Sequence, residues 1–143
     1  MSAYADTSFL VSLYVPDSNS AAASARMSTQ PLPVLITPLG ELELLNALQL
    51  YVFRKQIEPR LIRRAITAVR ADLRSGVLLL ASPPETLTYA EARRLAARWT
   101  AKLGVRALDI LHVASAVVLK ADSFHTFDYR QRKLAVAADL HVP

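Results

Sequence analysis

The chain of 143 residues is long enough for one domain, 1–143, which would bury roughly 70% of its unfolded surface. It contains no cysteine, which excludes a disulfide framework, a thiolate zinc site and a cysteine hydrolase. Its formal charge is +5, and it shows neither a signal peptide nor an apolar run of membrane-spanning length, so we expect a cytoplasmic protein with a polyanionic partner and no membrane contact.

Short apolar runs alternate with longer helical patterns along the chain. The runs predict strands at 2–5, 33–37, 77–81, 123–127 and 139–142. The intervals predict helices at 7–14, 19–28, 39–56, 59–75, 86–103, 107–121 and 129–137. This alternation is typical of parallel sheets covered by helices. We therefore predict an α/β fold, a single-domain α/β/α sandwich with a central, mostly parallel sheet.

Proline and glycine mark several of these boundaries. Pro38 and Pro59 stand at the starts of predicted helices, where a missing N–H costs little. Gly76 follows the helix predicted at 59–75, as expected for a residue just beyond a helix C-terminus. The helix predicted at 107–121 is apolar nearly all round, so we expect it to be buried.

Four acidic residues, Asp6, Glu43, Asp109 and Asp128, lie at strand ends or on predicted helices. Asp6 and Asp128 each close a predicted strand, and the carboxyl ends of parallel strands meet at one edge of a sheet. Carboxylates that converge repel one another unless a hard cation such as Mg²⁺ or Mn²⁺ lies between them. The pattern therefore predicts a divalent-metal site. A second interpretation stays open, because aspartate at a helix start is also a favoured N-cap.

The helix predicted at 39–56 carries two glutamates, Glu41 and Glu43. Successive helical residues are about 100° apart, so these side chains point about 200° apart and cannot both face one site. We assign Glu43, which has small and polar neighbours, to the site, and Glu41 to a favourable position near the helix N-terminus. We expect His112, one helical turn after Asp109, to pack outside the site, because hard cations prefer oxygen ligands.

The acids and their neighbours, in this order, resemble the PIN-domain family, and most closely the VapC-type toxins of toxin–antitoxin pairs. The segments that carry the resemblance are 4–8, 43–48, 108–116 and 126–128. The resemblance implies a PIN-like fold in which Asp6, Glu43, Asp109 and Asp128 hold Mg²⁺ or Mn²⁺ for cleavage of RNA by metal-activated water. It also implies a cognate VapB-type antitoxin. The family includes members that bind without cutting, so a non-catalytic PIN-like module that binds RNA or protein is the alternative.

Composition adds two expectations about partners. Thirteen of the 17 basic residues are arginine, which contacts phosphate bidentately, so we predict that RNA follows a basic track. The candidate tracks are Arg54, Lys55, Arg60, Arg63, Arg64, Arg70 and Arg74, or Arg93, Arg94, Arg98 and Arg106. Hydrophobic residues make up 52% of the chain, more than one core needs, and the surplus on helices 39–56 and 19–28 predicts a homodimer.

Overall fold

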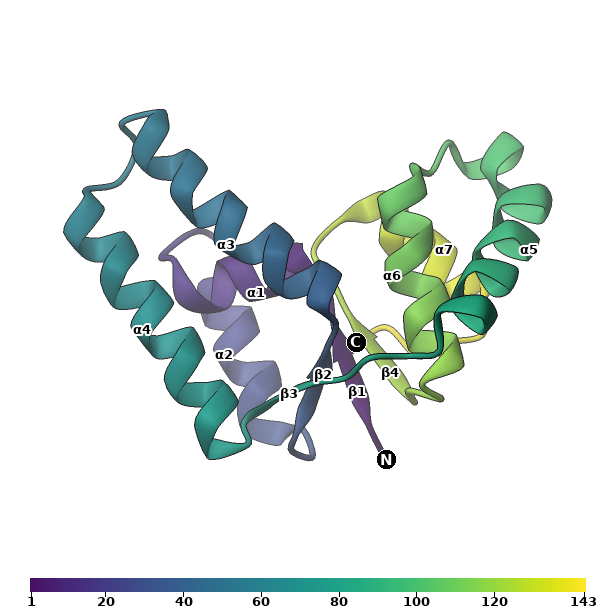
Figure 1. Ribbon diagram of the computed structural model, residues 1–143, viewed down its shortest axis with the longest axis horizontal. Helices are drawn as coiled ribbons and strands as arrows, with labels where there is room; N and C mark the ends of the chain where they lie inside the picture. Colours follow the sequence, from purple (N-terminus) through teal and green to yellow (C-terminus); the bar gives the residue numbers. More distant parts are fainter.

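A four-stranded parallel sheet forms the centre of the protein (Figure 1). The computed structural model describes residues 1–143, and its strands are β1 (Ala3–Ala5), β2 (Val34–Ile36), β3 (Leu78–Leu80) and β4 (Ser123–His125). Their order across the sheet is β3-β2-β1-β4, so β1 is paired on both sides. Tyr4 in β1 lies opposite Leu35 in β2 and Phe124 in β4. The predicted parallel sheet is confirmed.

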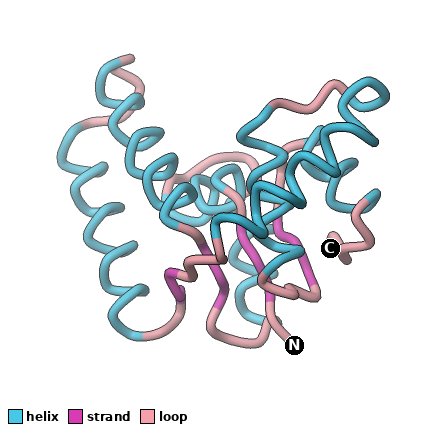
Figure 2. The backbone as a smooth tube through the Cα atoms, turned by 45° about the vertical axis from the view of Figure 1, so that its right-hand side comes forward, coloured by secondary structure: helices cyan, strands magenta, loops and turns pink.

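Six helices lie in the chain between strands and a seventh follows the last strand, and together they cover the sheet (Figures 1 and 2). They are α1 (Thr7–Tyr14), α2 (Ser20–Thr29), α3 (Pro38–Phe53), α4 (Pro59–Ser75), α5 (Glu85–Leu103), α6 (Ala107–Val118) and α7 (Tyr129–Ala137). In Figure 1, α1 to α4 lie on one side of the strands and α5 to α7 on the other. The predicted α/β class is therefore confirmed. None of the helices combines the length and the apolar character that a membrane crossing requires.

The two faces of the sheet bury separate hydrophobic cores, because side chains alternate in direction along a strand. In β1, Tyr4 packs with α5, α6 and α7, whereas Ala5 packs with α1 to α4. Tyr4 is fully buried, and its ring stacks on that of Phe124 with the centroids 5.4 Å apart. Val113 of the apolar helix α6 is also fully buried, as expected for this helix. The central strand therefore anchors both halves of the molecule.

Local signals in the sequence mark the ends of two helices. Thr37 is the N-cap of α3, where its hydroxyl accepts a hydrogen bond from the N–H of Gly40 (3.2 Å), and Pro38 follows at the first helical position. Gly76 ends α4 with φ 80°, a left-handed conformation that glycine adopts without a steric penalty. Both boundaries agree with those predicted.

Two helices end earlier than predicted. Helix α3 stops at Phe53 instead of residue 56, and α6 stops at Val118 instead of residue 121. Lys55 and Lys120, just beyond these ends, have left-handed backbones with φ 56° and 55°. A left-handed residue cannot continue a right-handed helix. The chain turns at these lysines and directs the next segment back towards the sheet.

The strand predicted at 139–142 is wrong. This segment makes a single isolated bridge, between His141 and Ser123 of β4. Asp139 has φ 62°, so the chain is still turning there and little extended backbone is left to pair. The segment lies beside β4 without adding a fifth strand to the sheet.

Candidate functional site

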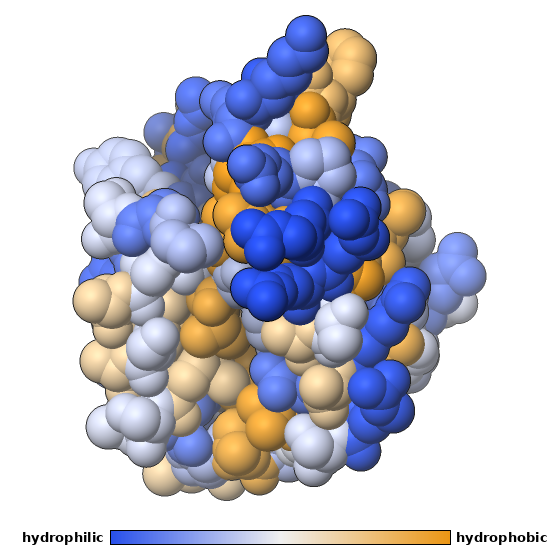
Figure 3. Space-filling view, turned by 90° about the vertical axis from the view of Figure 1, so that its left-hand side faces the viewer, coloured by the Kyte–Doolittle hydropathy of each residue, from blue (hydrophilic) through white to orange (hydrophobic).

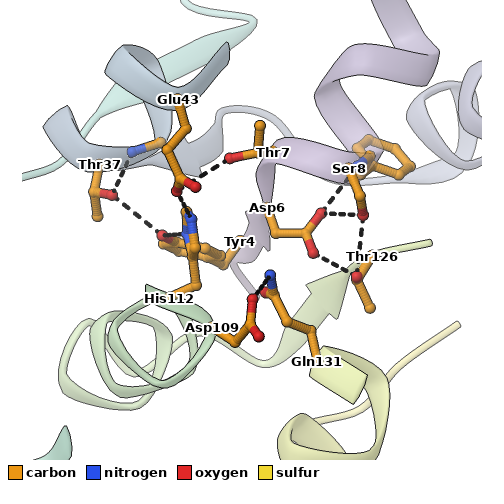
Figure 4. A network of polar contacts seen from close by, with 12 residues as sticks. Tyr4, Asp6, Thr7, Ser8, Thr37, Glu43, Asp109, His112, Thr126 and Gln131 are labelled. Carbon is orange, nitrogen blue, oxygen red and sulfur yellow. Dashed lines mark hydrogen bonds and ion pairs between the residues drawn. The ribbon is translucent and has the colours of Figure 1, made fainter. Parts of the chain in front are cut away.

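Asp6 lies directly after β1 and is fully buried (Figure 4). It is the N-cap of α1, and its Oδ1 accepts hydrogen bonds from the N–H of Phe9 (2.9 Å) and the hydroxyl of Ser8 (2.7 Å). The hydroxyl of Thr126 donates to Oδ2. Thr126 follows β4 and is 120 residues away in the chain, so the pairing of β1 with β4 brings this donor to Asp6.

Burial raises the pKa of the Asp6 carboxyl, and the hydrogen bonds from Thr126, Phe9 and Ser8 lower it in part. A buried carboxylate ionises at a cost unless donors or positive charge compensate for the lost water. Three neutral donors already face Asp6. The surroundings therefore favour a ligand that brings positive charge to this carboxylate.

Glu43 approaches the same region from α3. Its carboxylate accepts a hydrogen bond from the hydroxyl of Thr7 (3.3 Å) and contacts Nε2 of His112 on α6. His112 is 1% exposed, and its Nδ1 lies 2.8 Å from the hydroxyl of Tyr4. The packing of α6 places the imidazole of His112 against Glu43, and the expectation that His112 lies outside the metal site stays a prediction. Glu41 makes no side-chain hydrogen bond or ion pair.

Asp109 lies in the first turn of α6, at the third helical position. Its Oδ2 accepts a hydrogen bond from the N–H of Arg106 (3.2 Å), and its Oδ1 accepts one from the side-chain amide of Gln131 on α7 (3.1 Å). Gln131 is 6% exposed, and its amide oxygen is buried without a hydrogen-bond partner. An unpartnered oxygen beside a carboxylate is a ligand of the kind that hard cations take.

Asp128 is the N-cap of α7, where its Oδ1 accepts a hydrogen bond from the N–H of Gln131 (2.9 Å). The N–H of Asp128 donates to the hydroxyls of Thr126 (2.9 Å) and Ser8 (3.2 Å). These are the same hydroxyl groups that donate to Asp6. Asp6 and Asp128 are therefore fixed relative to each other through one pair of hydroxyl groups.

Comparison with known proteins assigns the chain to a family. A family model described as PIN domain matches residues 3–137, nearly the whole chain. The chain belongs to the PIN domain family. A search among curated proteins gives no significant match to this PIN domain.

Two solved structures share the fold of this PIN domain. VapC20 of Mycobacterium tuberculosis, described as a sarcin–ricin loop cleaving toxin, matches with a TM-score of 0.70 and 18% identity over 98% of this chain and 97% of that chain. FitAcB from Neisseria gonorrhoeae matches with a TM-score of 0.64 and 19% identity over 98% of this chain and 95% of that chain. At these identities the likeness concerns the fold.

In this PIN domain the acids come from four separate segments, and Figure 4 shows Asp6, Glu43 and Asp109 around one region. No group of three or more His, Cys, Asp or Glu side chains is arranged to hold a metal ion. The acids accept hydrogen bonds from nearby donors instead. Their oxygens, together with the free amide oxygen of Gln131, have the chemistry that Mg²⁺ or Mn²⁺ needs. The residues fit such an ion in donor type, and binding requires the side chains to draw closer.

Sequence reasoning missed two residues of this PIN domain site, His112 and Gln131. Each lies three residues after a predicted site aspartate, Asp109 or Asp128, and so shares its face of a helix. Asp128 and Gln131 also have the spacing of a capping box, a pattern that turns the later side chain back towards the helix start. Spacing was therefore the available signal for both residues.

Proposed function

We propose that this PIN domain is an endoribonuclease that depends on Mg²⁺ or Mn²⁺ and hydrolyses RNA phosphodiester bonds. The observation that supports it is the gathering of Asp6, Glu43 and Asp109 around one region (Figure 4). Asp128 is linked to Asp6 through the hydroxyls of Thr126 and Ser8. Ligands of parallel α/β sheets bind at the edge where the carboxyl ends of the strands lie. A divalent cation, when bound, lowers the pKa of water and neutralises charge on phosphate oxygens.

In this proposal the four carboxylates hold the ion. Their surroundings restrict the movement of some of these side chains more than that of others. Asp6 is fully buried and has three hydrogen-bond donors, so it fixes the position of the site. The side chain of Glu43 is 28% exposed, and His112 holds it by one oxygen. Glu43 therefore keeps a defined direction while remaining open to solvent and to the RNA.

Basic side chains on α4 give RNA a surface on which to approach. Arg63, Arg70 and Arg74 are exposed on this helix and recur at helical spacing, so they form one stripe. Figure 3 looks onto the side of the molecule where α4 lies, and hydrophilic side chains gather at the centre of that face. A broad positive surface attracts a polyanion, and the acids then bind it at one place through the ion.

We further propose that the protein is the toxin of a VapBC-type pair and forms a homodimer. The toxin VapC20 has a similar fold, which supports this role. Leu42 and Phe53 on α3 are 66% and 82% exposed, and apolar side chains of this kind favour a dimer contact. A VapB-type antitoxin can inhibit the site by inserting an arginine, which pairs bidentately with carboxylates and displaces the ion.

A cleavage assay tests the nuclease. Structured RNAs are incubated with purified protein in Mg²⁺, in Mn²⁺ or in EDTA. Asp6→Asn and Glu43→Gln should be inactive, because each removes ligand charge with little change of volume. Glu41→Gln, on the other side of the same helix, is the matched control and should be nearly normal. Cleavage retained by Asp6→Asn, after contaminating nucleases are excluded, would overturn the nuclease proposal.

A non-catalytic binding module is the second candidate. It is favoured by the backbone N–H bonds that Asp6, Asp109 and Asp128 accept, because helix caps need no cation. Calorimetric titration with Mn²⁺ separates the two candidates, since carboxylates that serve only as caps should give no binding heat. Co-expression tests the toxin role separately: the chain alone should slow growth, and the gene of the antitoxin should restore it.

A further inference from the structure

A cavity of about 460 Å³ lies between α2 and β4, within the size range of small-molecule sites. Its wall includes Arg26 of α2 and Gln30, the residue that caps the end of α2. Ser123 and His125 line it from β4, and His141 lines it from the segment that bridges to β4. None of the four acids of the candidate site contributes to its wall. The cavity is lined by residues at the starts of β1 and β4 and by His125 at the end of β4. Asp6 and Asp128 come after these strands, and Glu43 and Asp109 lie on α3 and α6.

Two nitrogen atoms of this wall are buried without a hydrogen-bond partner, Nδ1 of His125 and the side-chain amide nitrogen of Gln30. His125 is 2% exposed, and its Nε2 lies 3.4 Å from the hydroxyl of Ser123. When Nε2 of a neutral imidazole accepts a hydrogen bond from the hydroxyl of Ser123, the one ring proton lies on Nδ1, and Nδ1 is then a donor. Buried donors of this kind call for an acceptor.

The cavity wall carries one guanidinium that no carboxylate neutralises, whereas the N-terminal ammonium of Met1 lies 4.0 Å from the carboxylate of Asp122. Arg26 makes one long hydrogen bond, to the carbonyl of Thr126 (3.5 Å), lies 4.8 Å over the ring of Phe127, and pairs with no carboxylate. Burial, and then the charge of Arg132, lower the pKa of the Arg26 guanidinium. The acid on the rim, Asp122, already accepts a hydrogen bond from the N–H of Ser2 (2.6 Å). An anion in the cavity would meet the guanidinium of Arg26, which pairs with no carboxylate.

We propose that this cavity binds the phosphate group of a nucleotide-sized ligand. A guanidinium offers a planar fork of donors that matches phosphate oxygens, and Arg26 presents one that is not paired with an acid. Gln30 and His125 add one donor each. Together with the guanidinium, these donors outnumber the two oxygens of a carboxylate, so they suit the larger number of oxygens on a phosphate group. The volume left beyond a single phosphate accommodates a sugar and a base. Binding here requires neither the metal nor RNA cleavage.

Calorimetry in EDTA tests this site without the metal. The probes are inorganic phosphate, adenosine monophosphate, adenosine and a hexaribonucleotide. Adenosine monophosphate should bind, and adenosine should bind at least about tenfold more weakly, because charge-assisted hydrogen bonds to the phosphate are lost. Arg26→Gln should weaken binding of the phosphate-bearing probes to a similar degree. Lys102→Gln, an equal loss of charge at an exposed position of α5 outside both candidate RNA tracks, is the matched control and should stay within about twofold.

The probes also distinguish the source of the phosphate. If the hexaribonucleotide alone binds, and Arg26→Gln weakens it, the phosphate is that of a nucleic-acid chain. If adenosine monophosphate binds and Arg26→Gln weakens that binding, the phosphate is that of a free nucleotide. Should Arg26→Gln fail to fold by circular dichroism, His141→Gln on the exposed rim replaces it. Equal affinity for adenosine and adenosine monophosphate would overturn the proposal. Unchanged binding of the phosphate-bearing probes by a folded Arg26→Gln or His141→Gln protein would also overturn it. Neither result affects the proposed nuclease.

Discussion

His112 of α6 contacts Glu43 of α3 through Nε2, although 69 residues separate them in the chain. The other ring nitrogen lies 2.8 Å from the hydroxyl of Tyr4, which is 3.2 Å from the hydroxyl of Thr37. A solvent-facing carboxylate is thus connected to the centre of the sheet by a chain of polar contacts. Each link is buried or half-buried, so removing one leaves its neighbour without a partner.

The first prediction concerns His112 as a positioning residue. His112→Gln should lower kcat for RNA cleavage about tenfold with a small change in KM, because Glu43 loses its fixed direction. The free energy of unfolding should fall by about 1–3 kcal/mol. Tyr4→Phe keeps the stacking on Phe124 and removes only the hydroxyl, so its effect should be smaller. A wild-type kcat in His112→Gln would show that Glu43 needs no support from the imidazole.

The second prediction concerns Thr126, whose hydroxyl donates to Asp6 and accepts from the N–H of Asp128 (2.9 Å). Thr126→Val keeps the shape and removes both hydrogen bonds. We expect a loss of about 1–3 kcal/mol in urea unfolding at neutral pH, since a buried carboxylate loses a donor that lowers its pKa. Thr126→Ser retains the hydroxyl and should stay close to the wild type. Equal losses in the two variants would point to the methyl group instead.

The third prediction concerns pH. The pKa of His125 is lowered from 6.5 to about 4 in the folded protein. Between these values the unfolded chain binds the proton and the folded chain does not, so stability falls as the pH is lowered through this window. The free energy of unfolding should therefore be lower at pH 4 than at pH 7, by on the order of 2 kcal/mol. NMR titration of the imidazole measures the pKa, and urea unfolding from pH 7 to pH 4 measures the slope. An NMR pKa near 6.5 would contradict the prediction.

The fourth prediction separates the two basic tracks. Replacing Arg63, Arg70 and Arg74 by glutamine should weaken RNA binding and reduce its salt dependence by about one unit of slope per lost phosphate contact. The matched control replaces Arg93, Arg94 and Arg98 on α5. If the control has the larger effect, RNA follows α5 instead of α4. If neither triple variant changes the salt slope, the arginines on both helices are only solvated surface.

Local patterns in the sequence were sufficient to predict most of the fold. Pro59 and Gly76 set the ends of α4 through backbone restrictions that act within a few residues. The same patterns do not determine the order of strands, because pairing joins segments as distant as β1 and β4. Prediction also failed at 139–142, where an apolar run resembles a strand but the turn at Asp139 leaves it a single bridge.

For the candidate site, too, some features could be predicted from the sequence and others could not. Asp6 and Asp128 could be placed from the sequence, because each directly follows a predicted strand and caps the next helix. The contacts of His112 with Glu43 and of Gln131 with Asp109 each join two helices. Such contacts depend on how helices pack against one another, which residue spacing within a single helix does not specify. Sequence spacing therefore identified which helix faces carry these residues, and only the structure identified their contact partners on other helices.

The pairing of β1 with β4 has a consequence for synthesis of the protein. The donor that Asp6 needs, Thr126, lies 120 residues later in the chain. A nascent chain that has not yet delivered β4 from the ribosome has a central strand paired on one side only. The acidic residues therefore cannot reach their final arrangement until translation is almost complete, because long-range strand pairs form only after the intervening chain is available. Prematurely terminated chains that lack β4 should consequently lack the hydrogen bond from Thr126 that fixes Asp6.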